Sequence, residues 1–198
     1  LRVGPGVLVP RPETELVVER VLRHLPADRD LDVLDLASGS GAIALAVASE
    51  RPRCRVVATD VAPAAVEATR ENALRLGLGD RVAVLQGAWF EPVVRRRFDL
   101  IASNPPYIAA DDPRVESGVR RYEPAEALFA GPTGLEALQV IAAGAARHLR
   151  PDGWLVVEHG DTQGAAVRAL FTAAGFGEVH TVRDLSGYER CTEGRRRG

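Results

Sequence analysis

Asn104, Pro105, Pro106 and Tyr107 form a group whose residue types and spacing could do chemistry. They follow the apolar run 98–103, and a strand cannot continue through paired prolines, because proline lacks the N–H that a strand ladder needs. The side-chain oxygen of Asn104 and the carbonyl of Pro105 are therefore two hydrogen-bond acceptors on a stiffened backbone. Asn-Pro and Pro-Pro are also common in loops that have no chemical role. The rest of the sequence has to separate these two interpretations.

A second group follows the apolar run 31–37 and predicts a nucleotide site. The small residues Ala37, Ser38, Gly39, Ser40 and Gly41 form a loop in which glycine lets the backbone turn tightly and approach a ligand, while the next helix presents free N–H groups. Asp60 ends the following apolar run about 20 residues later, where a carboxylate can accept hydrogen bonds from ribose hydroxyls.

Asp35 separates the two nucleotides that this loop could bind. The spacing Gly39-x-Gly41-x-x-Ala44 fits the fingerprint of dinucleotide-binding domains, so a dehydrogenase is a competing hypothesis. A carboxylate beside the loop would repel a pyrophosphate, whereas it suits a ligand with positive charge. S-adenosylmethionine carries a sulfonium, an ammonium and a ribose but no phosphate, and Asp35 favours it. Asp35 can also be a structural carboxylate that caps amides of the loop, and the two roles are compatible.

With that cofactor, the Asn104 group acquires a chemical meaning. The nitrogen of an amide, or of an amino group on a ring, is a poor nucleophile because its lone pair is delocalised. Acceptors at Asn104 and Pro105 would hold its N–H groups so that the lone pair faces the methyl group, and Tyr107 would pack against the planar substrate. Catalysis would come from orientation and electrostatics, without a conventional general base.

The order of elements predicts an α/β fold. Short apolar runs alternate with alanine-rich helical stretches, which indicates a mostly parallel sheet with helices on both faces. The last two runs flank a turn at Ser186 and Gly187, which predicts an antiparallel edge and seven strands in all. The predicted strands are 31–37, 54–60, 81–87, 98–104, 154–160 and the terminal pair. The predicted helices are 13–25, 134–149, 162–174 and those beginning near Gly41 and Pro63.

Composition predicts one ordinary domain of 198 residues with a cytoplasmic location. The net charge of -2 argues against a dedicated duplex-binding protein, and there is no apolar run long enough for a membrane span. Cys54 and Cys191 suggest neither a disulfide framework nor a thiolate metal site. The four histidines show no metal-ligand spacing, so no metal is expected. The basic runs 95–97, 120–121 and 195–197 are interpreted as solvated loop and tail charge.

Motifs along nearly the whole chain resemble the HemK/PrmC family of bacterial release factor glutamine methyltransferases. The combination of "PRPETE", "NPPY" and "YEP…AL" is far more specific than any one of them. The matching segments are "GVLVPRPETE" (6–15), "LDLASGSGAIALAVASERP" (34–52), "VVATD" (56–60), "FDLIASNPPYI" (98–108), "YEPAEALFAGPTGL" (122–135), "VVEHG" (156–160) and "VRDLSGYER" (182–190).

The resemblance implies methyl transfer from S-adenosylmethionine, with S-adenosylhomocysteine as product, to the side-chain amide of a glutamine in a peptide-chain release factor. It also implies a Rossmann-like fold of the class I S-adenosylmethionine-dependent methyltransferase type, and it implies neither a membrane nor direct nucleic-acid binding. The catalytic residues would be Asn104, Pro105, Pro106 and Tyr107. The cofactor residues would be Asp35, Ala37, Ser38, Gly39, Ser40, Gly41, Asp60, Trp89 on the adenine side, and Asn104.

Three departures from the family pattern accompany this resemblance. The family commonly has Gly where this chain has Ala37, and Asp where it has Ala88. Residues 1–198 would be the catalytic domain, with a lead-in hairpin at 1–12, and the family's N-terminal helical domain is not present in this sequence. The chain contains no Met, which we interpret as the sign of a catalytic-domain fragment.

Two other functions remain open at this level. One is methylation of an amino group on a nucleic-acid base, since similar Asn-Pro-Pro-aromatic motifs serve there; that would call for a basic face and a target-recognition domain. The other is a nucleotide-binding domain without methyltransferase activity. Among further polar residues, His159 is expected to be structural, and Glu13 and Glu15 to favour the dipole of the first helix.

Overall fold

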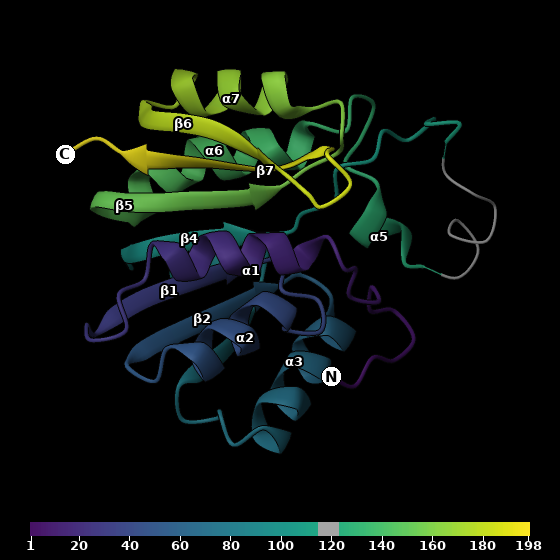
Figure 1. Ribbon diagram of the computed structural model, residues 1–198. Coiled ribbons are helices and arrows are strands. Elements are labelled where there is room, and N and C mark those ends of the chain that lie inside the picture. Colours follow the sequence, from purple (N-terminus) through teal and green to yellow (C-terminus); the bar gives the residue numbers. More distant parts are fainter. Residues whose placement is uncertain (115–122) are drawn as a thin grey trace.

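A computed structural model describes residues 1–114 and 123–198. It contains a seven-stranded sheet with the order β3-β2-β1-β4-β5-β7-β6, and Figure 1 shows the strands with the helices around them. The strands are β1 (Leu31–Leu36), β2 (Cys54–Asp60), β3 (Val82–Gln86), β4 (Phe98–Ser103), β5 (Leu149–Glu158), β6 (Phe176–Arg183) and β7 (Glu189–Arg196). The helices are α1 (Thr14–Arg23), α2 (Ala42–Glu50), α3 (Pro63–Arg75), η1 (Glu91–Val93), α5 (Ala125–Leu128), α6 (Glu136–His148) and α7 (Gly164–Ala173).

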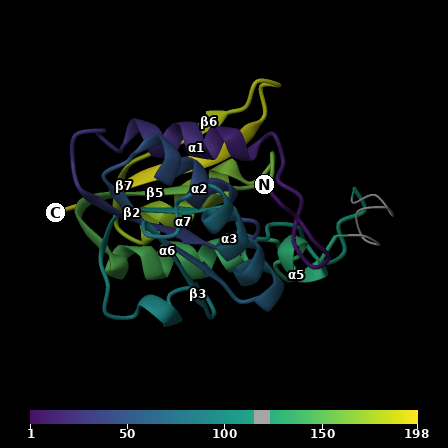
Figure 2. The ribbon, with the colours of Figure 1, turned by 90° about the horizontal axis from the view of Figure 1, so that it is seen from below.

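The sheet is buried on both faces, as the nearly continuous apolar strands predict. Successive side chains of a strand point to opposite faces, so Val33 packs in a cluster with α1, α2 and α3, whereas Leu34 packs in a second cluster with α6 and α7. Figure 2 shows α1 and α6 on opposite sides of the strands. The strands β3, β2, β1, β4 and β5 are parallel neighbours. Their carboxyl ends therefore meet at one edge.

The antiparallel strand lies at the predicted end of the sheet. β7 pairs antiparallel with β5 on one side and with β6 on the other, so β7 is an inner strand and β6 is outermost. Glu193 of β7 is fully buried and receives two hydrogen bonds from the Arg20 guanidinium of α1, at 2.8 and 2.6 Å. This ion pair joins the first helix to the last strand.

The lead-in hairpin predicted at 1–12 is not found. Residues 1–13 contain no strand, and form an irregular segment with a turn at Gly4–Val7 that leads into α1. Pro5, Pro10 and Pro12 lack the N–H groups that a hairpin ladder requires, which accounts for the difference. The segment instead lies along the carboxyl edge of the sheet.

Smaller differences occur elsewhere. β5 begins at Leu149 rather than Trp154, because Leu149 pairs with Phe98 ahead of an irregularity in the register. The short elements α5 and η1 were not predicted, since three or four residues carry no periodicity. Arg120, Arg121 and Tyr122 lie outside the described residues. In the part of the chain that the structure describes, no helix has the length and apolar character to cross a membrane.

Candidate active site

A cavity of about 250 Å³ opens at the carboxyl edge of the sheet, beyond β1, β2 and β4. This is the edge at which open α/β sheets bind their ligands. Nine predicted residues line the cavity: Asp35, Ala37, Ser38, Gly39, Ser40, Asp60, Trp89, Asn104 and Pro106. The residues Gly41, Pro105 and Tyr107 do not line it. The two predicted groups, one from the cofactor loop and one from the Asn104 motif, therefore share one cavity.

The loop between β1 and α2 has the backbone geometry for which glycine was expected. Gly41 has φ +84°, and a Cβ there would lie 2.9 Å from Cγ2 of Thr69 on α3. Gly39 has φ +57°, and Ala37 also lies in the left-handed region, at φ +55°. A side chain at Ala37 costs strain in this region. The loop is closed by the Gly41 N–H, which donates to the Ser38 carbonyl at 2.7 Å.

Asp35 is a buried carboxyl with one unsatisfied oxygen. Its Oδ2 accepts from the backbone N–H of Ala44 at 3.0 Å, in the first turn of α2. Among the described residues Oδ1 has no hydrogen-bond partner, and the same holds for Oγ of Ser38. Burial raises the pKa of Asp35 to about 8, and the negative charge of Asp60 adds to this effect. A cationic ligand in the cavity would supply what this carboxyl lacks.

Asp60 holds the loop in place and keeps room for a ligand. Its Oδ2 accepts from the N–H of Gly39 and its Oδ1 from the N–H of Ala62, both at 2.9 Å. Burial raises the pKa of this carboxyl as well, while these backbone hydrogen bonds oppose the rise. Each carboxylate oxygen has a further lone pair. Asp60 can therefore brace the loop and still accept from the hydroxyls of a ribose.

Asn104 is held from the opposite side of the cavity by α1. The Nδ2 group of Asn104 donates to Oγ1 of Thr14 at 2.9 Å, and Thr14 donates its own hydrogen to Oε2 of Glu158 at 2.8 Å. Glu158 is almost fully buried, and burial raises its pKa, while its hydrogen bonds and the charge of Arg190 oppose the rise. Oδ1 of Asn104 accepts no hydrogen bond from the described residues.

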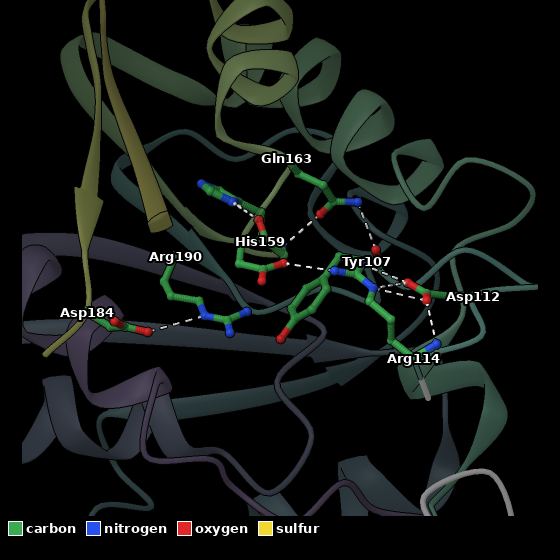
Figure 3. Close-up of polar contacts among 9 residues, drawn as sticks. Tyr107, Asp112, Arg114, His159, Gln163, Asp184 and Arg190 are labelled. Carbon is green, nitrogen blue, oxygen red and sulfur yellow. Dashed lines mark hydrogen bonds and ion pairs between the residues drawn. The ribbon is translucent and has the colours of Figure 1, made fainter. Parts of the chain in front are cut away.

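Tyr107 is turned away from the cavity. Its hydroxyl donates to Oε1 of Glu158 at 3.0 Å, and its backbone carbonyl accepts from Nε2 of Gln163 at 2.9 Å. Figure 3 shows the ring with Gln163 on one side and the guanidinium of Arg190 near its hydroxyl. Burial and the negative charge of Glu158 raise the pKa of Tyr107. In the structure Tyr107 therefore fixes the loop through its contacts with Glu158 and Gln163.

The sequence matches known methyltransferases along almost its whole length. The family described as "Methyltransferase small domain" matches residues 14–122. A release factor glutamine methyltransferase of Xylella fastidiosa (strain Temecula1) is 50% identical over 193 residues, which cover 98% of this chain and 70% of that protein. The Escherichia coli (strain K12) protein of the same name is 43% identical over 195 residues, again 98% and 70% of the two chains.

The chain belongs to the release factor glutamine methyltransferase family.

Solved structures give the same result for the fold. A release-factor-specific protein-(glutamine-N5) methyltransferase of Alicyclobacillus acidocaldarius is 29% identical, with a TM-score of 0.60 and full coverage of both chains. A Thermus thermophilus 16S rRNA N2 G1207 methyltransferase, solved with AdoMet and guanosine, has a TM-score of 0.70. It is 22% identical and covers 96% of this chain and 44% of that one. At that identity the likeness shows the fold alone.

In this member of the release factor glutamine methyltransferase family, both positions that depart from the family pattern line the cavity. Ala37 adopts a positive φ, which favours glycine, so the alanine at this position costs strain. Ala88 lines the cavity, and its backbone N–H donates to Oε2 of Glu91 at 3.3 Å. Ala88 therefore brings no side-chain carboxylate to the cavity.

Several lining residues were missed from the sequence. The cavity is also bordered by Gly6, Val7, Leu8, Pro10 and Thr14, and by Glu126 and Ala127 of α5. Residue type gives no signal for them, and only the segments "GVLVPRPETE" and "YEPAEALFAGPTGL" pointed to this part of the chain. Figure 1 shows α5 at the end of the sheet toward which the parallel strands point.

His159 has the structural position that was expected. Its ring nitrogens lie 2.8 Å from the carbonyl of Gly160 and 2.8 Å from Oγ1 of Thr192, and it does not line the cavity. Glu13 precedes α1 and Glu15 lies in its first turn, where both favour the helix dipole. Within the described ranges no cluster of His, Cys, Asp and Glu could hold a metal ion.

Proposed function

We propose that this chain transfers a methyl group from S-adenosylmethionine to the side-chain amide nitrogen of a glutamine in a peptide-chain release factor. The observation that carries the proposal is the cavity itself, in which a cofactor half and an acceptor half face each other. Asp35 and Asp60 border the cavity together with Asn104, whose Oδ1 accepts no hydrogen bond from the residues that the structure describes. The names of the 43–50% identical relatives support the substrate.

The cavity fits the charges of S-adenosylmethionine. The unsatisfied Oδ1 of Asp35 and Oγ of Ser38 would hold its cationic amino-acid part, and Asp60 would accept from its ribose hydroxyls. Trp89 borders the cavity beyond the carboxyl end of β3 and would pack on the adenine side. When bound, the cofactor supplies an electrophilic methyl group on a sulfonium. No phosphate is needed, and two carboxyl groups would disfavour one.

The residues of the chain contribute orientation. Oδ1 of Asn104 would accept one N–H of the substrate amide, and the backbone carbonyl of Pro105 is a candidate for the other. Held in this way, the nitrogen directs its lone pair at the methyl group; an N–C bond forms as the S–C bond breaks. The nitrogen then loses a proton to water, so no buried base is required.

Mass spectrometry of a release factor incubated with the protein and S-adenosylmethionine tests the proposal. We expect a mass increase of one methyl group, located on a glutamine side chain, and no product when NAD replaces S-adenosylmethionine. Parallel incubations with RNA and with DNA test the alternative that the substrate is a nucleic-acid base. Methylation of a nucleic acid but not of the release factor would overturn the proposed substrate, and tight binding of NAD without S-adenosylmethionine binding would overturn the cofactor.

A further inference from the structure

The hydrogen bonds between Glu158, Thr14 and Asn104 form a chain with a defined direction. Glu158 accepts from two hydroxyl groups, those of Thr14 and Tyr107, one on each carboxylate oxygen. With Glu158 ionised, the carboxylate can only accept hydrogen bonds. The hydroxyl hydrogen of Thr14 is therefore directed at Glu158, and a lone pair of its Oγ1 is left for the next partner.

That next partner is the side-chain amide of Asn104, and the direction of the chain decides which end faces Thr14. Oγ1 of Thr14 has already given its one hydrogen to Glu158, so it can only accept from Asn104. The NH₂ group of Asn104 therefore faces Thr14, with Nδ2 2.9 Å from Oγ1, and Oδ1 is directed away from Thr14. Asn104 and Thr14 both line the cavity, whereas Glu158 lies behind them.

The opposite orientation would be the wrong one for the proposed reaction. The substrate nitrogen carries N–H groups, and the NH₂ of a flipped Asn104 would place donor against donor. We propose that Glu158 is a positioning residue that acts through Thr14 to present Oδ1 of Asn104 to the substrate amide. This inference rests on the proposed function and extends it to Thr14 and Glu158, which lie outside the Asn-Pro-Pro-Tyr motif.

The contacts around Glu158 support a fixed geometry. Thr14 is 7% exposed and Glu158 is 1% exposed, so the hydrogen bond between them is shielded from water. Thr14 is the first residue of α1, and Glu158 is the last residue of β5. Both side chains are thus set on regular elements, while Asn104 is on the loop after β4. A rigid support for a loop residue is what orientation-based catalysis requires.

Three substitutions test the chain of hydrogen bonds. Thr14→Val removes the hydroxyl with almost no change in volume, and Glu158→Gln introduces an amide that can donate to Thr14 and reverse the direction. Each is expected to lower kcat by roughly 10- to 100-fold, with KM and the Kd for S-adenosylmethionine within about threefold of the wild type. Thr14→Ser restores the hydroxyl and should return kcat to within about threefold.

Thr181→Val is the matched control. Thr181 also has a partly buried hydroxyl in a network, with Thr192 at 2.7 Å and Arg168 at 2.7 Å, but it lies on β6 and does not line the cavity. It should keep the wild-type kcat. Melting temperatures of all variants identify any that fail to fold. If folded Thr14→Val or Glu158→Gln keeps kcat within about threefold of the wild type, the positioning role is wrong.

A second readout does not depend on the release factor. The chain contains two asparagines, Asn72 and Asn104, so ¹⁵N-asparagine labelling gives two pairs of side-chain NH₂ signals. Thr14→Val and Glu158→Gln should shift the Asn104 pair and leave the Asn72 pair in place, and Thr181→Val should move neither. An unmoved Asn104 signal would overturn the inference. If instead the signal moves but the wild type methylates no release factor, the network stands and the proposed substrate fails.

Discussion

The pH dependence of cofactor binding should be set by Asp35. Its carboxyl is buried at the end of β1, and burial raises its pKa to about 8. Below that pH the carboxyl is mostly protonated in the protein without ligand. A ligand with sulfonium and ammonium charges binds the ionised form better than the neutral acid, so binding releases a proton. The affinity for S-adenosylmethionine should therefore increase as the pH rises.

The magnitude follows from the release of one proton. Well below the pKa, the affinity should rise about tenfold for each pH unit, or about 1.4 kcal/mol of binding free energy. Between pH 5.5 and 7.5 the Kd should fall by about 100-fold. The α-amino group of the ligand, with an ordinary pKa of about 7.7, is largely protonated up to about pH 7 and still about 60% protonated at pH 7.5. Above about pH 8 the affinity should stop rising, because Asp35 is then already ionised.

Isothermal titration calorimetry in two buffers of different ionisation enthalpy measures both the Kd and the protons released. Asp35→Asn should bind roughly 10- to 100-fold more weakly at pH 7.5 and should lose the pH dependence, because a charged acceptor is removed. Asp32→Asn is the control, since Asp32 lies on the same strand but pairs with Arg150 at 2.7 Å. Asp32→Asn should keep the wild-type slope. A wild type that releases no proton, or a slope that persists in Asp35→Asn, would refute this reasoning.

Asn104→Ala should lower kcat by at least about 100-fold while the Kd for S-adenosylmethionine stays within about threefold, because the lost acceptor matters in the transition state; near-normal turnover would return the motif to ordinary loop structure. Ala37→Gly should stabilise the protein by up to about 1 kcal/mol, since it removes a Cβ at positive φ. Ala68→Gly inside α3 is the control and should lower the unfolding free energy by about 1 kcal/mol. Chemical denaturation measures both changes, and a loss of stability in Ala37→Gly as well would contradict the strain at Ala37. Arg20→Ala should cost about 3 kcal/mol of unfolding free energy, because buried Glu193 loses the guanidinium and keeps only the ring nitrogens of His24 and His180 as partners, with kcat unchanged in the folded fraction.

The sequence predicted those parts of the candidate site whose position depends on a single strand or loop. Asp35, Asp60 and Asn104 each stand at or just after the carboxyl end of a strand, and parallel strands place those ends at one edge. The glycine loop was equally local, because its geometry depends on a few successive residues. Such features can be predicted from apolar runs and from the residues that interrupt them.

The rest of the site depends on contacts between distant parts of the chain. Thr14 reaches Asn104 across 90 residues, and Glu158 reaches Thr14 across 144. Periodicity carries no information on which end of α1 meets which loop. Tyr107 was expected to face the substrate because its residue type suits stacking, but Glu158 supplies a buried acceptor that holds its hydroxyl elsewhere. Only the packed structure decides between such competing partners.

The inner place of β7 has a consequence for synthesis. Ribosomes complete β5 and β6 before the residues of β7 exist, yet β7 has to insert between them. Until Glu189–Arg196 arrives, two strands have open edges that can pair with other chains, and Arg20 has no Glu193 to meet. A premature stop or a protease cut before Glu189 would therefore leave an aggregating chain rather than a smaller enzyme. The first observable effect of losing these last residues should be insoluble protein, although none of them borders the cavity.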